Sequence, residues 1–496
     1  MKIRPSIQTL IPLVCLLLEA TAQAIIPPPD GGYPGFTTAE GTKALQNLTS
    51  GVANSGLGWY SLFTNSTASY NTGVGAATLV LNNGDENTAT GAGALFLNTT
   101  GTGDTATGAF ALLFNDSGLA NTAVGDQSLY SNTEGDFNTA TGFFALHDNV
   151  SGAGNTAHGA SALLHNTTGS LNTAVGGNTL FSNTTGDENT AMGANALSSN
   201  TTGFRNTANG VNALQHATVG QDNTATGHLS LGSTTNGTSN TAMGSSALLN
   251  NTEGSSNTAV GAISLGDNVT GLSNTAFGDT ALRHNTIGSR NTAIGTNALQ
   301  KNVSGAGNIA VGYESGDLVV TASNVISIGS AGADVDNSCY IGNIWQEDGG
   351  SQAVYVNASG KLGAQVSSRR FKHDIKPMEH SSEVIYSLNP VSFRYNTEIE
   401  PTCPMAYGLI AEDVEQIDRD LVAHDKDGRA FSVRYDQVNA MVLNEFLKEH
   451  RKNEQQEATI ARQQKQIEAL AAGLQKVSAD LELSKHTPQV GSTHRD

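Results

Sequence analysis

The stretch NTAVGDQSLYSNTEGDF, residues 121–137, is one unit of a repeat that occupies more than half of the chain. The tripeptide NTA or a near copy begins at residue 87 and returns every 17 residues as far as residue 308, with fainter copies at 54 and 71. A fixed period over so many copies predicts a repeat architecture in which each unit packs on its neighbours.

The composition of the unit favours strands over helices. Glycine in nearly every half-unit would cost a helix about 1 kcal/mol each, whereas Thr, Val and Ala beside Gly and Asn suit short strands with tight corners. No proline lies between Pro34 and Pro377, as expected where backbone N–H groups join a ladder. We predict a β-solenoid or β-roll over residues 44–316, with Asn and Thr ladders between coils and Ala, Val and Leu inside. Because a single coil buries little, we also expect a homotrimer.

The N-terminus resembles an export signal. Lys2 and Arg4 precede an apolar run at 11–18, and Ala22-Gln23-Ala24 offers a small-residue cleavage site. We therefore expect a signal peptide at 1–24 and an exported protein, extracellular or on the surface of a bacterium. A Pro/Gly-rich segment at 25–43 would follow. The net charge of −19 argues against a nucleic-acid partner.

The repeat pattern ends near residue 316, and the character of the chain changes again after 366. Alternating apolar residues predict a β-rich connector at 317–366. Beyond it we expect a small α+β domain at 367–452, a coiled coil at 453–484 and a disordered tail at 485–496. Within the small domain, the sequence predicts a strand at 391–396, a helix after 407, a hairpin turning at Asp427-Gly428 and a long helix from 435 to 484.

The long helix has a heptad pattern. Phe446, Ile460, Ile467, Leu474 and Leu481 share one heptad position, and Leu470 and Val477 share the other. The pattern predicts a coiled coil between copies of the chain. A single helix that buries this stripe against its own domain is the alternative.

The stretch VSSRRFKHDI, residues 366–375, places two serines close before a lysine. A serine hydroxyl becomes a good nucleophile only when a base takes its proton, and a lysine serves only as the neutral amine, which requires desolvation or nearby positive charge. Arg369 and Arg370 could supply such a field. Solvated basic residues after a linker would give the same spacing.

Three stretches carry a family resemblance: SSRRFKHDIKPM (367–378), YGLIAEDVEQI (407–417) and SVRYDQVNAMVLNEFLKEH (432–450). Together they resemble the C-terminal intramolecular chaperone domain of phage tail spikes and fibres, of the endosialidase type. The resemblance implies a domain that assists trimerisation of a preceding β-structured fibre and then removes itself through a Ser–Lys dyad. The 17-residue repeat itself is similar in style to the head repeats of trimeric autotransporter adhesins.

The family motif S-D-x-R-x-K can be carried over residue by residue. It makes Ser367 the nucleophile, Arg370 the motif arginine and Lys372 the general base, and it places the scissile bond next to Ser367, within Val366-Ser367-Ser368. Ser368 stands where the motif has Asp. That departure bears on how efficient cleavage would be and on which serine acts.

We therefore interpret the chain as an exported trimeric fibre or adhesin-like protein with a self-cleaving, single-turnover tail, no cofactor and no metal. Its partners would be its own copies and a cell-surface or glycan receptor of unknown identity. The alternative is a non-cleaving protein that binds polysaccharide or ice through its Thr and Asn ladders, with a permanent trimerisation tail. A glycan-degrading enzyme is disfavoured because the carboxylates of the repeat are scattered at turns instead of paired.

Overall fold

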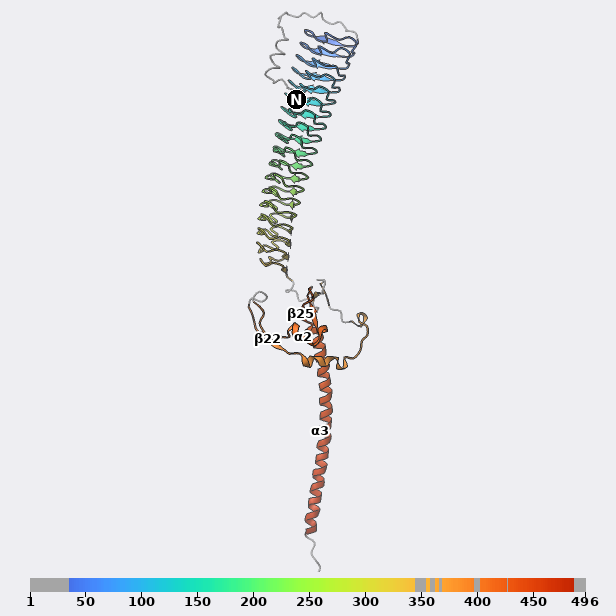
Figure 1. Ribbon diagram of the computed structural model, residues 1–496, viewed down its shortest axis with the longest axis vertical. Helices are drawn as coiled ribbons and strands as arrows, with labels where there is room; N and C mark the ends of the chain where they lie inside the picture. The colour runs from blue at the N-terminus through green and yellow to red at the C-terminus, as the bar shows by residue number, and fades with distance from the viewer. Residues whose placement is uncertain are drawn as a thin grey trace, which may run out of the picture. The chain divides into compact units, whose positions relative to one another are not determined.

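The computed structural model describes residues 35–343, 354–356, 362–364, 368–396, 402–425 and 427–485. The chain divides into two compact units, one before and one after residue 347. Each unit is described by itself (Figure 1).

The first unit is a parallel β-solenoid of 19 three-residue strands in one sheet. Each strand pairs in register with the next, so that Thr190 faces Thr207 and Ala191 faces Ala208. At a strand spacing of about 4.8 Å the stack is roughly 85 Å long. The strands are β1 (Thr38–Glu40), β2 (Ser55–Leu57), β3 (Thr72–Val74), β4 (Thr88–Thr90), β5 (Thr105–Thr107), β6 (Thr122–Val124), β7 (Thr139–Thr141), β8 (Thr156–His158), β9 (Thr173–Val175), β10 (Thr190–Met192), β11 (Thr207–Asn209), β12 (Thr224–Thr226), β13 (Thr241–Met243), β14 (Thr258–Val260), β15 (Thr275–Phe277), β16 (Thr292–Ile294), β17 (Ile309–Val311), β18 (Ile326–Ile328) and β19 (Cys339–Ile341).

The paired strands extend beyond the range 44–316. Strand β1 lies in the segment that we expected to be Pro/Gly-rich, and β18 and β19 lie in the expected connector. The NTA letters lapse at both ends, but the inward position survives: Ala39 and Tyr340 pack against the solenoid core. A middle strand residue that packs against the core, more than the NTA letters, therefore identifies a coil.

From β4 to β16 each coil contributes the middle Ala of its strand and one Leu to the solenoid core, and many of these coils bury a second Ala directly before that Leu. In the coil that begins at Asn121, Ala123 and Leu129 are both fully buried. The corner after each strand requires glycine: Gly125 has φ +136°, and a Cβ there would lie 2.4 Å from the carbonyl oxygen of Gly142 in the next coil. The coils can stack closely because these corners carry no side chain.

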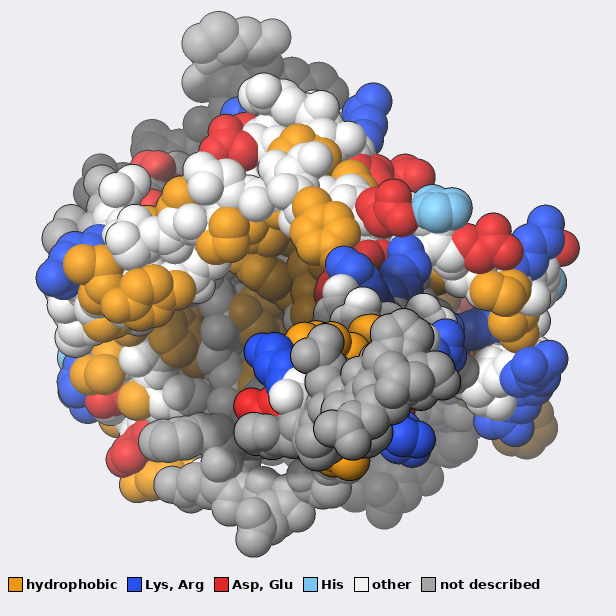
Figure 2. All heavy atoms as spheres, turned by 90° about the horizontal axis from the view of Figure 1, so that it is seen from below, with side chains coloured by type: hydrophobic (Ala, Val, Ile, Leu, Met, Phe, Trp, Pro, Cys, Tyr) orange, Lys and Arg blue, Asp and Glu red, His pale blue; other side chains and the backbone are white. Residues whose placement is uncertain are grey.

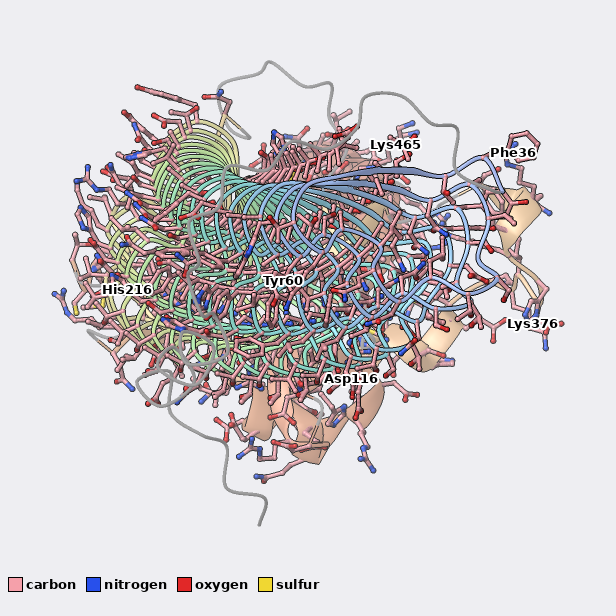
Figure 3. All side chains as sticks on the ribbon, turned by 90° about the horizontal axis from the view of Figure 1, so that it is seen from above. Phe36, Tyr60, Asp116, His216, Lys376 and Lys465 are labelled. Carbon is pink, nitrogen blue, oxygen red and sulfur yellow. The ribbon has the colours of Figure 1, made fainter. Side chains whose placement is uncertain are left out.

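Two ladders of buried asparagines join the coils. In the first, the Asn138 backbone N–H and Nδ2 donate to Asn121 Oδ1 at 3.0 and 3.1 Å. In the second, Asn132 Nδ2 donates to Asn115 Oδ1 at 2.8 Å. Each buried amide thus finds its partner in the neighbouring coil, which removes most of the cost of burying it. Figure 3 looks along the stacked coils, with exposed Asp116 and His216 pointing away from them.

Each ladder has a departure from asparagine. The second ladder has Ala217 and Thr234 in place of Asn, and there Asn200 Oδ1 and Thr234 Oγ1 have no hydrogen-bond partner. The cause is direct, because Ala217 has no amide to donate to Asn200. The first ladder contains Asp104, whose carboxylate accepts from Asn121 N–H at 2.8 Å and Asn115 Nδ2 at 3.0 Å. Burial raises the pKa of Asp104 to about 7, although hydrogen bonds from Asn121 and Asn115 oppose the shift.

The second unit contains short antiparallel hairpins and one long helix. Strand β20 (Val354–Val356) pairs with β21 (Leu362–Ala364), β22 (Val391–Phe393) with β23 (Ala406–Gly408), and β24 (Val422–His424) with β25 (Ala430–Val433). The helices are the 3₁₀ segments η1 (Arg369–Phe371), η2 (Glu379–Ser387) and η3 (Arg419–Leu421), and the α-helices α2 (Ala411–Ile417) and α3 (Tyr435–Lys485). The predicted hairpin with its turn at Asp427-Gly428, the helix after residue 407 and the long helix are confirmed.

The apolar core of this second unit is small. Five hydrophobic side chains are buried in it, namely Val414, Leu421, Val422, Val433 and Val438. The predicted fold class, a long β-solenoid followed by a small domain and a long helix, is confirmed. The homotrimer stays a prediction.

Candidate functional site

The described part of the predicted dyad segment, residues 368–372, forms a single exposed turn that follows the β20–β21 hairpin in sequence. Ser368 precedes η1, and the N–H groups of Phe371 and Lys372 donate to the carbonyl oxygens of Ser368 and Arg369 at 3.0 and 3.1 Å. The Arg370 guanidinium lies 4.5 Å from the centroid of the Phe371 ring. The turn therefore brings Ser368, Arg370 and Lys372 together within five residues, and all three are exposed in the single chain.

Val366 and Ser367 lie outside the described residues. The proposed nucleophile and the scissile bond are therefore not placed, and the Ser–Lys dyad stays a prediction. A lysine can act as a general base only as the neutral amine, and Lys372 lies on an exposed turn.

A polar cluster that the sequence did not reveal holds η2 against α3. Glu445 is nearly buried and accepts from Ser382 Oγ, from Tyr386 OH at 2.8 Å and from Lys448 Nζ at 2.6 Å. Asn444 Nδ2 donates to Ser382 Oγ at 2.7 Å. We call these five residues the η2–α3 clamp.

The clamp is an ionic contact with a clear preferred protonation state. Hydrogen bonds from Lys448, Ser382 and Tyr386 lower the pKa of Glu445 to about 2, against the opposing effect of burial. The Glu445 carboxylate in turn raises the pKa of Lys448. Both groups are therefore held in their charged forms near neutral pH. The clamp anchors η2, which begins at Glu379, seven residues after Lys372 in the chain.

Sequence reasoning missed the clamp because its members are far apart in the chain. Ser382 and Glu445 are separated by 63 residues. Ser382 belongs to no motif. Glu445 lies within the stretch 432–450 that carries the family resemblance, but nothing in that stretch marks it as buried, and it stands next to Phe446 in a helix rich in charged residues. The burial of a glutamate on a mostly solvated helix is the signal that identifies the clamp, and only the structure shows that burial.

The heptad stripe of α3 is exposed along its length. The described chain leaves Ile460, Ile467, Leu474 and Leu481 between 58% and 69% exposed, and Leu470 and Val477 are exposed to a similar degree. The alternative in which the helix buries this stripe against its own domain does not hold within the described residues. Hydrophobic side chains also stand among charged ones on the face of the molecule shown in Figure 2.

Residues 367–423 match the family described as chaperone of endosialidase. No curated protein and no solved structure matches the chain significantly. The chain thus joins a fibre-like β-solenoid to a C-terminal region similar to the chaperone of endosialidase, and the resemblance inferred from the motifs is confirmed for that region.

None of the described helices is both long enough and apolar enough to cross a bilayer. Among the same residues, no group of three or more His, Cys, Asp or Glu side chains could hold a metal ion.

Proposed function

We propose that this protein is an exported, trimeric fibre whose C-terminal unit acts as an intramolecular trimerisation chaperone. The observation that carries the proposal is the unburied stripe of α3 beside a core of five apolar side chains. A domain that exposes so much more apolar surface than it buries gains stability when copies cover one another. Three parallel helices would bury the stripe in a coiled-coil seam.

The construction of the stalk explains why a trimerisation tail would be useful. Each strand of the solenoid has only three residues, and each coil depends on its neighbours for hydrogen bonds. Association of separate stalks in register is therefore slow and prone to error. A tail that assembles first raises the effective concentration of the stalks for one another.

Self-cleavage is the second part of the proposal. Ser367 Oγ would add to the carbonyl carbon of the adjoining scissile bond, while Lys372 accepts the hydroxyl proton and passes it to the departing amide nitrogen. Water would then hydrolyse the ester and release the tail. Because the segment is exposed in the single chain, we propose that neighbouring copies supply the desolvation that Lys372 needs, so that cleavage follows assembly.

The test compares the mass and the oligomeric state of the full chain with those of Ser367→Ala, Lys372→Ala and the control Ser368→Ala. We expect the parent and Ser368→Ala to release a fragment of about 130 residues, and the other two variants to stay intact. Ser368→Asp, which restores the family motif, should speed release. An intact parent under all conditions would reduce the tail to a permanent trimerisation domain. Release from Ser367→Ala but not from Ser368→Ala would move the nucleophile to Ser368.

One observation favours the second candidate, a non-cleaving protein that binds an ordered surface. The first outward position of the strands is Thr without interruption from Thr72 to Thr292, in register between neighbouring coils. The regular spacing of this row of threonines could match the surface of a crystalline polysaccharide or of ice. Sedimentation of the Ser367→Ala protein with insoluble polysaccharide, and its effect on ice recrystallisation, test this candidate. Loss of either activity on Thr→Lys substitution in this row of threonines would support the second candidate.

A further inference from the structure

One long face of the stalk is almost without charge. In every strand the middle residue points into the core, and the first and third residues point outward from the sheet; we call this surface the outer sheet face. Residues 35–343 contain 19 Asp and Glu and 5 Lys and Arg, which gives a net charge of −14. Among the outward positions of the strands, however, only Glu40 in β1 is charged. From β2 to β19 the face carries no Asp, Glu, Lys or Arg.

The outer sheet face becomes apolar toward the end of the stalk that precedes the tail in sequence. From β13 to β19 the third position is apolar in every strand, and the first position becomes Ile in β17 and β18. These residues, which we call the apolar strip, are Met243, Val260, Phe277, Ile294, Ile309, Val311, Ile326, Ile328 and Ile341. Neighbours such as Phe277 and Ile294 pair in register, so the strip is continuous.

The strip is exposed in the single chain. Phe277 is 57% exposed and Ile294 44%. Soluble proteins rarely leave a continuous apolar surface of this length in water without a partner. Charge indicates which partner. A stalk of net charge −14 repels other copies of itself along every charged face, and the outer sheet face is where that repulsion is least.

We propose that the apolar strip is the surface along which the stalks of neighbouring copies pack, with their strands running in the same direction. The partner that fits the strip is a second copy of this chain, because the second copy carries the same apolar residues at the same spacing of one strand per coil over all seven strands. The inference rests on the proposed trimerisation and adds to it the surface and the order of events. Packing would begin at the end of the stalk nearest the tail in sequence and proceed toward the Thr-rich part of the face.

The test is disulfide cross-linking in the full chain, with Cys15, Cys339 and Cys403 replaced by Ser and with Ser367→Ala to keep the tail attached. The probe is Ile294→Cys in the strip. Its matched control is Ile287→Cys, because Ile287 is 59% exposed and lies outside the strands, in the coil that contains Phe277. Under mild oxidation we expect Ile294→Cys to link copies at least tenfold faster than Ile287→Cys, and Phe277→Glu to reduce that rate.

The outcomes separate this inference from the proposed function. If native mass spectrometry shows trimers while Ile294→Cys links no faster than Ile287→Cys, the tail assembles copies but the strip does not join them, and the inference is overturned. The outer sheet face would then remain available to bind an ordered surface, as in the second candidate function. If the protein is monomeric and neither thiol links copies, the inference and the proposed trimerisation fail together.

Discussion

In the stalk, every buried side chain is covered by the next coil of the same chain, whereas the second unit leaves most of its large apolar side chains in water. Leu146, in the middle of the stalk, is fully buried, and Leu474, in the middle of α3, is 69% exposed. The same residue type thus serves two purposes. The stalk is stabilised by contacts between its own coils, whereas under the proposed function the tail gains further stability from other copies.

The two regions also treat polar groups differently. The stalk buries neutral amides that satisfy one another from coil to coil, and Asp104 is the one carboxylate in its Asn ladders. The tail uses ions, with Glu445 and Lys448 held charged in the η2–α3 clamp. This difference predicts opposite responses to pH.

The same substitution in both regions should have very different local effects. Leu146→Ala leaves a cavity between coils, and we expect a loss of about 2–5 kcal/mol in the stability of the surrounding coils. Leu474→Ala removes a side chain that touches water in the single chain, so it should weaken association between copies and leave the stalk unchanged. Hydrogen exchange of the stalk amides and native mass spectrometry measure the two effects. Equal loss of stalk protection in both variants would contradict the comparison.

Asp104 should make part of the stalk less stable as the pH rises. Its pKa is raised to about 7 in the folded protein from 3.8, so the folded state binds more protons between these values and stability falls across this pH window. A shift of about 3 pH units corresponds to at most about 4 kcal/mol. We expect Asp104→Asn to remove most of this fall, as seen in hydrogen exchange of neighbouring coils at pH 5 and pH 8. The substitution Asp116→Asn, at an exposed position, is the control and should have little effect.

The clamp should respond in the opposite sense and more weakly. The pKa of Glu445 is lowered to about 2 from 4.5, so its contribution is present above about pH 4.5 and is lost as the pH falls toward 2. Glu445→Gln should therefore increase exchange of the η2 amides relative to the parent at pH 7, and the difference between variant and parent should be smaller at pH 3. Glu449→Gln on the same helix is the matched control. If Glu445→Gln exchanges like the parent at pH 7, the clamp does not anchor η2.

Repair of the second Asn ladder should give the smallest effect. Ala217→Asn would supply the donor that Asn200 Oδ1 lacks, and we expect the nearby coils to gain about 1 kcal/mol. Slower hydrogen exchange around residue 200 is the readout, with Ala217→Ser as a control that is too short to reach. Loss of protection in Ala217→Asn would mean that this coil has no room for the amide.

The regular part of the fold could be predicted from the sequence, and the reason is physical. A strand residue such as Ala123 recurs at a fixed spacing because every coil must bury the same position. The ends of the solenoid could not be placed this way, because Tyr340 still packs inward after the NTA letters have gone. The contact of Ser382 with Glu445 spans 63 residues and follows no period, so no local pattern could reveal it.

The most direct test of the central claim is native mass spectrometry of the full chain in the Ser367→Ala background, with and without Ile467→Glu and Leu474→Glu. Glutamate at these positions would place charges in the seam of a coiled coil but would leave a solitary helix exposed as before. We expect trimers for the parent and monomers for the double variant, with unchanged hydrogen exchange in the stalk. A monomeric parent, or a double variant that remains trimeric, would contradict it.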